Sequence, residues 1–127
     1  MFGEPALKNF VQEALDETIK LETALSRLDH KDAAMPKIVL IHYAPIKQTI
    51  EGEPEAIFPW LGCSRFEEPI NKMRATAVFH GHAHLGRLHA KTSQGVDVFN
   101  VSMAILEKDR VEHPFFIYEV SINEPVS

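Results

Sequence analysis

A continuous apolar run that ends in a histidine constrains the fold of this chain more than any other feature. The run spans Ile38 to Ile41 and is followed by His42 and, three residues later, Pro45. A short run that is rich in β-branched residues and apolar without alternation is typical of a strand buried on both faces. His42 is therefore expected at the carboxyl end of a buried strand, where catalytic groups gather in α/β sheets.

A second apolar run, Ala75 to Phe79, leads directly into segment 80–84, which reads His-Gly-His-Ala-His. Neutral imidazole is the commonest metal-binding side chain, and a nearby glycine lets a tight loop aim two rings at one point. A lone histidine on an apolar strand is more often a hydrogen-bonded core residue. Three histidines clustered after a buried strand instead predict a metal site.

The other elements are expected to complete a small α/β domain. An apolar stripe from Leu7 to Leu28, with steps of four and three, predicts a long N-terminal helix. Segments 88–92 and 96–101 flank a turn and predict a hairpin. Alternation over residues 115–121 predicts a final strand. With 127 residues, the chain is expected to form a single domain that spans 1–127.

Two features lie between the predicted strands. Ser64 and Glu67 match a capping box, which predicts a helix that continues to about Met73. Residues 46–63 look irregular, and a loop this long in a small domain is more often functional than idle. Within it, Phe58 and Trp60 either line a pocket or pack.

Composition excludes several functional classes. The net charge of −5 argues against nucleic-acid binding, because it repels polyanions. The apolar runs are far too short to span a membrane, and we expect no membrane association. The single cysteine, Cys63, excludes an intrachain disulfide and fits a reducing compartment, so we expect a cytoplasmic protein.

The histidine blocks fit one metalloprotein family better than others. Metallo-β-lactamase-like hydrolases and cupins place other residues after the His-x-His pair, and amidohydrolase barrels carry the pair near the start of a far longer chain. Here, Val78-Phe79-His80-Gly81-His82-Ala83-His84 resembles the Gly-His-x-His block of calcineurin-like metallophosphoesterases. Segment 38–45, Ile-Val-Leu-Ile-His-Tyr-Ala-Pro, resembles the block that precedes it in that family. The resemblance covers about residues 37–105.

The resemblance implies a four-layer α-β-β-α sandwich and a two-metal centre. By it, His42 and His82 would bind one divalent ion (manganese, iron or zinc), His84 would bind the other, and His82 would act in catalysis. His80 matches a position that is not a ligand, so it is expected to be structural or to support the ligands. The implied reaction is hydrolysis of phosphomonoesters or diesters by a metal-activated water.

The acidic half of this family's site is missing from the chain. The family's earlier blocks are Asp-x-His, Gly-Asp-x-x-Asp and Gly-Asn-His, yet the sequence contains neither a Gly-Asp nor a Gly-Asn dipeptide. We therefore expect the C-terminal half of the sandwich, inactive or weakly active by itself. A missing N-terminal half, lost through a start-site choice, a frameshift or a cloning boundary, or else a second chain, would supply the carboxylates.

Without the other half of the sandwich, one face of the sheet and one strand edge would be left uncovered. Exposed apolar sheet surface invites pairing, so we expect a homo-oligomer that buries it. The alternative function is a non-catalytic metal-binding or oligomerising module.

Other residues carry weaker signals. Asn100 is expected to be a hydrogen bonder at a strand end and Cys63 a packed thiol, whereas Arg65 is expected at the surface. The remaining histidines, at positions 30, 89 and 113, are expected to be surface or structural residues.

Overall fold

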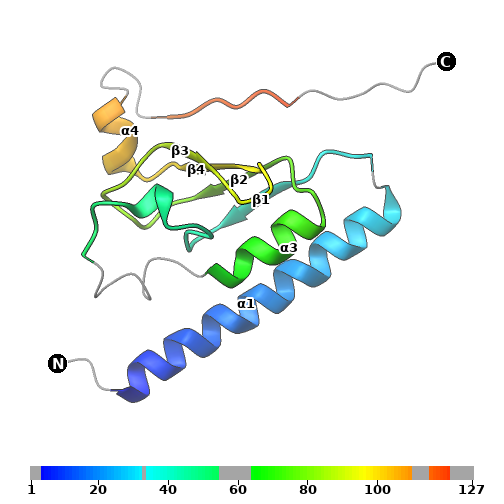
Figure 1. Cartoon of the computed structure of the whole chain (residues 1–127), viewed down its shortest axis with the longest axis horizontal. Coiled ribbons are helices and arrows are strands. Elements are labelled where there is room, and N and C mark those ends of the chain that lie inside the picture. The colour runs from blue at the N-terminus through cyan, green and yellow to red at the C-terminus, as the bar shows by residue number, and fades with distance from the viewer. Residues whose placement is uncertain (1–3, 33, 55–63, 110–114, 121–127) are drawn as a thin grey trace.

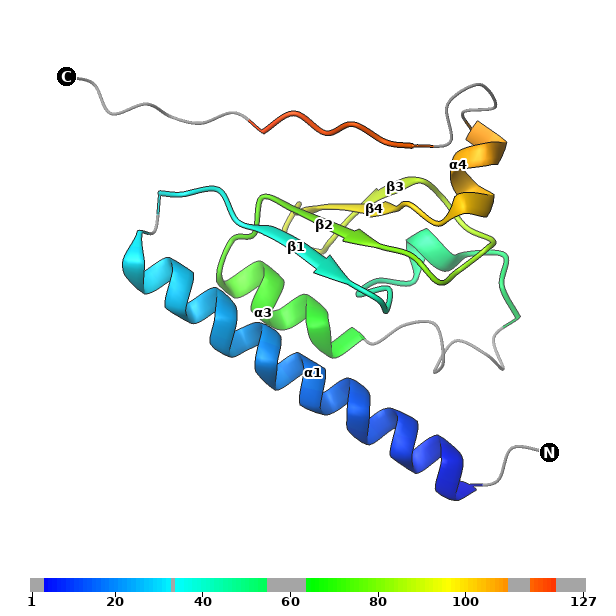
Figure 2. The same cartoon turned by 180° about the vertical axis from the view of Figure 1, so that it is seen from behind.

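A long helix precedes a four-stranded mixed sheet in this α/β protein, as the sequence predicted (Figure 1). The computed structural model describes residues 4–32, 34–54, 64–109 and 115–120. Helices α1 (Glu4–Lys31) and α3 (Glu67–Lys72) lie against the same face of the sheet. Residues 115–120, which are called the C-terminal stretch below, pass over the opposite face in both views (Figures 1 and 2).

The sheet has the strand order β1-β2-β4-β3. Strands β1 (Ile38–Ile41), β2 (Ala77–His80) and β4 (Asp97–Asn100) are parallel, whereas β3 (His89–Lys91) is antiparallel to β4. The predicted hairpin is therefore confirmed as β3 and β4. Because β1, β2 and β4 run in the same direction, the loops that come after them meet at one edge of the sheet.

One row of valines forms the core between the sheet and the helices. Val39, Val78 and Val98 are in register on neighbouring strands. They share a buried cluster with Leu25 of α1 and Ile70 of α3. Burial of a valine side chain stabilises a fold by about 2 kcal/mol, so this row is a main source of the sheet's attachment to its helices.

The opposite face is covered by aromatic side chains from the C-terminal stretch. Phe79 and Phe99 are in register and stacked, with ring centroids 5.2 Å apart. Phe116 and Tyr118 pack on this pair, at centroid distances from Phe99 of 4.8 and 5.4 Å. Within 115–120 the backbone forms no strand, so the predicted final strand is wrong over these residues. The segment is held by side-chain packing.

Strand β1 is less buried than the sequence predicted. Val39 is buried, but Ile38 is 41% exposed and Leu40 is 78% exposed. The prediction of burial on both faces is wrong for β1. This strand is an edge strand of the sheet, and the aromatic side chains that cover β2 and β4 leave Ile38 and Leu40 exposed. The prediction holds better for β2, where Ala77, Val78 and His80 are buried.

Helix boundaries depart from the local signals in two places. Ser64 begins a 3₁₀ helix, η3 (Ser64–Phe66), and α3 starts only at Glu67. The predicted capping box is wrong: the N-cap of α3 is Phe66, without a side-chain cap, and the Glu67 carboxylate accepts the Ser93 N–H at 2.7 Å. Helix α4 (Met103–Asp109) was not predicted from the sequence, in which no element was expected between residue 101 and residue 115.

Only some of the apolar side chains of α1 are buried against the rest of the protein. Ala14 and Leu25 are buried, whereas Val11, Ile19 and Leu28 are exposed. The predicted helix is confirmed, but its periodicity overstates the buried face. Among the described residues, no helix is both long enough and apolar enough to cross a lipid bilayer.

Candidate functional site

The three parallel strands deliver the segments after them to one edge of the sheet. His42 comes directly after β1, and the loop 81–86 comes after β2. The two segments are joined by a small buried cluster of Ala44, Ile50 and Ala83. This packing brings together parts of the chain that are about forty residues apart.

His42 and His82 lie side by side at this edge. Their ring centroids are 4.3 Å apart, with an interplanar angle of 36°. Tyr43 meets the His42 ring edge-on at 5.1 Å and is stacked on the buried Phe66 at 6.2 Å. Although the His42 side chain is exposed, its pKa is lowered, first by desolvation and then by the nearby His82 ring. Two adjacent imidazoles are chemically suited to bind a divalent ion.

His82 has an unusual backbone conformation. Its φ of 70° lies in the left-handed region, which costs a non-glycine residue about 1 kcal/mol. Such a residue persists only where the surrounding structure holds it. The bonds made by its neighbours in the loop therefore decide where the His82 ring points.

His80 is buried, and both of its ring nitrogens are engaged in hydrogen bonds within the protein. Its Nδ1–H donates to the Gly81 carbonyl at 3.0 Å, because a carbonyl can only accept. Its Nε2, 2.7 Å from the Thr49 hydroxyl, is then the acceptor of that O–H. Burial lowers the pKa of His80 to about 4, with a smaller contribution of the same sign from His42. This geometry agrees with the structural role expected from the sequence.

Asn100 and Ser102 bind the backbone of the loop 81–86, which is called the histidine loop below. The Asn100 amide donates to the carbonyls of Thr49 and Ala83, at 3.0 and 3.2 Å. Ser102 Oγ donates to the same Ala83 carbonyl at 2.7 Å. The prediction that Asn100 is a hydrogen bonder at a strand end is confirmed, and its bonds join three segments.

Glu53, which no sequence pattern singled out, holds the other side of the loop. Its Oε1 accepts the backbone N–H groups of His84 and Leu85, at 2.9 and 2.8 Å. A lone glutamate between Gly52 and Pro54 carries no local signal for this role. Only the approach of the two loops, made possible by tertiary packing, could have identified it.

His84 is held by its backbone, and its side chain is exposed. Among the residues that the structure describes, no group of three or more His, Cys, Asp or Glu side chains is placed to hold a metal ion. The two neighbouring imidazoles thus fit part of a coordination shell, and the remaining ligands would have to be water or another polypeptide. The assignment of His84 to a second ion stays a prediction.

No protein-family model, curated protein or solved structure matches this chain. Its function is therefore inferred from its own residues and their geometry.

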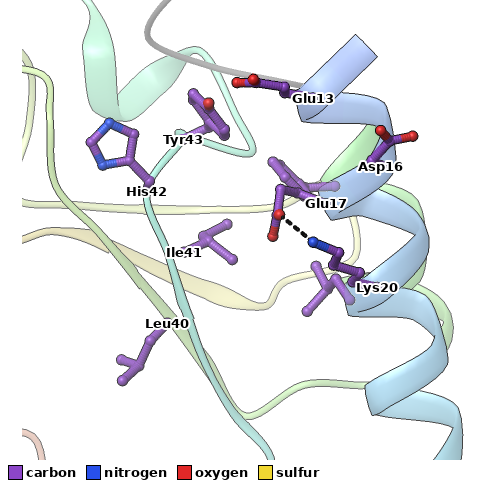
Figure 3. A pocket seen from close by; sticks show the side chains of 10 residues that line it. Glu13, Asp16, Glu17, Lys20, Leu40, Ile41, His42 and Tyr43 are labelled. Atoms are coloured by element: carbon purple, nitrogen blue, oxygen red, sulfur yellow. Dashed lines mark hydrogen bonds and ion pairs between the residues drawn. The ribbon is translucent and has the colours of Figure 1, made fainter. Parts of the chain in front are cut away.

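A cavity of about 680 Å³ lies between α1 and β1 and is lined by His42 but not by His82. Figure 3 shows Glu13, Asp16 and Glu17 on its helical wall, and Glu17 is paired with Lys20 at 3.0 Å. His42 lines the same cavity, but among the described residues these carboxylates do not form a metal-binding group with it. The acidic side chains of α1 thus face the cavity without completing the histidine pair.

The remaining candidates have ordinary surroundings or lie outside the described residues. Arg65 is exposed beside a groove between α1 and α3, and His30 is exposed on α1. His89 is exposed and lies 2.8 Å from the Asp97 carboxylate, across the hairpin. The residues that fall outside the described part of the chain are Phe58, Trp60, Cys63 and His113.

Proposed function

We propose that this chain supplies the histidine side of a metal-dependent phosphoesterase site that hydrolyses phosphomonoesters or diesters. The proposal is carried by one observation, the adjacency of His42 and His82 at the carboxyl ends of neighbouring parallel strands. Two residues from sequence blocks about forty residues apart, each resembling a ligand block of metallophosphoesterases, meet in space. Chance packing of surface histidines would not explain why the two residues that resemble metal ligands in sequence are also neighbours in space.

The chain's own residues would bind and orient one divalent ion. His42 and His82 each offer a ring nitrogen, and the proposal requires a nitrogen of each ring to lie about 2 Å from the same ion. Manganese, iron and zinc all accept such ligands. When bound, the ion would polarise a phosphoryl oxygen and lower the pKa of a water molecule. Tyr43 holds the His42 ring in place through its edge contact.

The acidic ligands belong to a missing N-terminal half or to a second chain under this proposal. Such a polypeptide would add the other layers of a four-layer sandwich. The exposed Ile38 and Leu40 on β1 offer apolar surface for a second sheet. By itself, the chain would be inactive or weakly active, since two imidazoles do not provide the charge balance of a two-metal centre.

Calorimetric titration with Mn²⁺ and Zn²⁺ tests the metal site directly. Wild type should bind one ion weakly, His82→Ala should lose that binding, and the exposed control His30→Ala should keep it. Equal binding by wild type and His82→Ala would refute the proposal.

Turnover of p-nitrophenyl phosphate and bis(p-nitrophenyl) phosphate with Mn²⁺ tests the second part. We expect the isolated chain to hydrolyse both slowly or not at all. Rapid hydrolysis that is abolished in His82→Ala would show that the chain is a complete enzyme.

An oligomerising module is the second candidate, favoured by the exposure of β1. Leu40 is 78% exposed on a strand at the end of the sheet, and such strands pair readily with another chain. A second copy is the proposed occupant. Sedimentation should show a homo-oligomer for wild type and a shift toward monomer for Leu40→Glu. A monomeric wild type at high concentration would exclude this candidate.

A further inference from the structure

Glu53 and the histidine loop form a contact that reaches across the sequence. One carboxylate oxygen of Glu53 accepts two consecutive backbone N–H groups, those of His84 and Leu85, at 2.9 and 2.8 Å. Hydrogen bonds to an ionised acceptor are roughly twice as strong as those between neutral groups. The residues joined are 31 and 32 positions apart, so the contact is tertiary and not a local turn.

One peptide unit of the loop, between Ala83 and His84, is held at both of its polar groups. Its carbonyl, that of Ala83, accepts from Asn100 and Ser102. Its N–H, that of His84, donates to Glu53. These bonds fix the orientation of the peptide unit that begins one residue after His82, the residue with φ of 70°.

The backbone of the histidine loop also lies close to the backbone of segment 49–53. A Cβ added at Gly86 would lie 1.9 Å from the Thr49 carbonyl oxygen, so only glycine fits there. A Cβ added at Gly52 would lie 3.6 Å from Leu85 Cβ, which is ordinary contact. Residues 49–53 therefore form a fixed wall for the loop, and Glu53 is the side chain that reaches from this wall to its N–H groups.

We propose that Glu53 is a positioning residue that holds the loop so that the His82 ring lies beside His42. Without its carboxylate, two backbone N–H groups lose their acceptor and the left-handed conformation of His82 loses support. The His82 ring then leaves His42, and the affinity for a divalent ion falls. The part that concerns the ion rests on the proposed function, whereas the part that concerns the ring geometry does not.

The first test measures the ring geometry in the metal-free protein. Rings with centroids 4.3 Å apart should give nuclear Overhauser contacts between the His42 and His82 ring protons in wild type. Glu53→Ala should lose these contacts, and Glu53→Gln should keep them because its amide oxygen can accept the same two N–H groups. Contacts that persist in folded Glu53→Ala would overturn the proposal.

Glu51 offers a matched control in the same segment. It is two residues away, and its carboxylate pairs with Arg87 at 3.2 Å on the surface. Glu51→Ala removes the same charge and should leave the ring contacts unchanged. Loss of the contacts in Glu51→Ala as well would mean that any change in this segment moves His82, which overturns a specific role for Glu53.

The second test is calorimetric titration with Zn²⁺. Removing a residue that orients a metal ligand typically lowers affinity by about tenfold or more, so Glu53→Ala should bind about tenfold more weakly than wild type. Glu53→Gln should stay within about twofold, because it restores the acceptor. A residue that only stabilised the fold would lower the melting temperature without changing the affinity of the folded protein.

A further variant keeps the proposal testable if Glu53→Ala does not fold. Glu53→Asp keeps the charge but is one methylene shorter, so it should weaken the ring contacts although Glu53→Gln retains them. Intact contacts in Glu53→Asp would overturn the proposal. If the ring contacts respond as expected but wild type binds no Zn²⁺, the proposed function fails while the positioning role stands.

Discussion

The buried imidazole of His80 is expected to make the folded state sensitive to mild acid. Burial lowers the pKa of His80 to about 4, compared with the ordinary value of 6.5 for histidine. The unfolded chain therefore binds a proton near pH 6.5, whereas the folded chain does not until about pH 4. Since the unfolded state binds more protons in this window, stability falls as the pH falls.

The two pKa values set the size of the effect. Each pH unit between them costs about 1.4 kcal/mol, so the full difference corresponds to roughly 3 kcal/mol below about pH 4. At about pH 5 the loss from this group alone is about 2 kcal/mol, and above about pH 7 it is close to zero. A loss of this size is large relative to the stability of roughly 5–15 kcal/mol that is typical of native proteins.

Urea unfolding followed by circular dichroism at about pH 7 and about pH 5 measures this effect. The comparison variant is His80→Gln, which does not titrate but can still accept the Thr49 O–H. On acidification, wild type should lose about 2 kcal/mol more than this variant. His30→Gln, altered at an exposed histidine of α1, should behave like wild type. Equal losses in wild type and His80→Gln would refute the assignment of acid sensitivity to His80.

Two further predictions concern the loops around the histidine pair. Asn100→Ala should lower the free energy of unfolding by roughly 3 kcal/mol in urea titrations. The reason is that the carbonyls of Thr49 and Ala83 and the Ser102 N–H each lose a buried hydrogen-bond partner. A loss well under about 1 kcal/mol would contradict this. Gly86→Ala should lower the melting temperature more than Gly95→Ala does. Both glycines have positive φ, but only at Gly86 would the new Cβ collide with backbone, at Thr49, so equal shifts would disprove the close packing.

The histidines of the candidate site were predictable from the sequence, but their geometry was not. Segment 80–84 and His42 stand out because imidazoles come after apolar runs, and this is a local property of the sequence. The distance between His42 and His82 depends on β1 and β2 being parallel neighbours. Glu53 was missed because its partners are backbone N–H groups, which nearly every residue carries and no sequence pattern marks.

The sequence by itself determined where most of the helices and strands lie, because hydrophobic periodicity is set by local geometry. It predicted α1, β1, β2 and the β3–β4 hairpin. Only the tertiary structure decided how deeply each element is buried, since burial depends on what packs against it. Leu40 is exposed and His80 is buried, although both belong to apolar runs. The reason is what packs on each side chain: the aromatic residues of 115–120 cover Phe79 and Phe99 but leave Leu40 exposed, whereas the Thr49 hydroxyl lies 2.7 Å from the His80 ring.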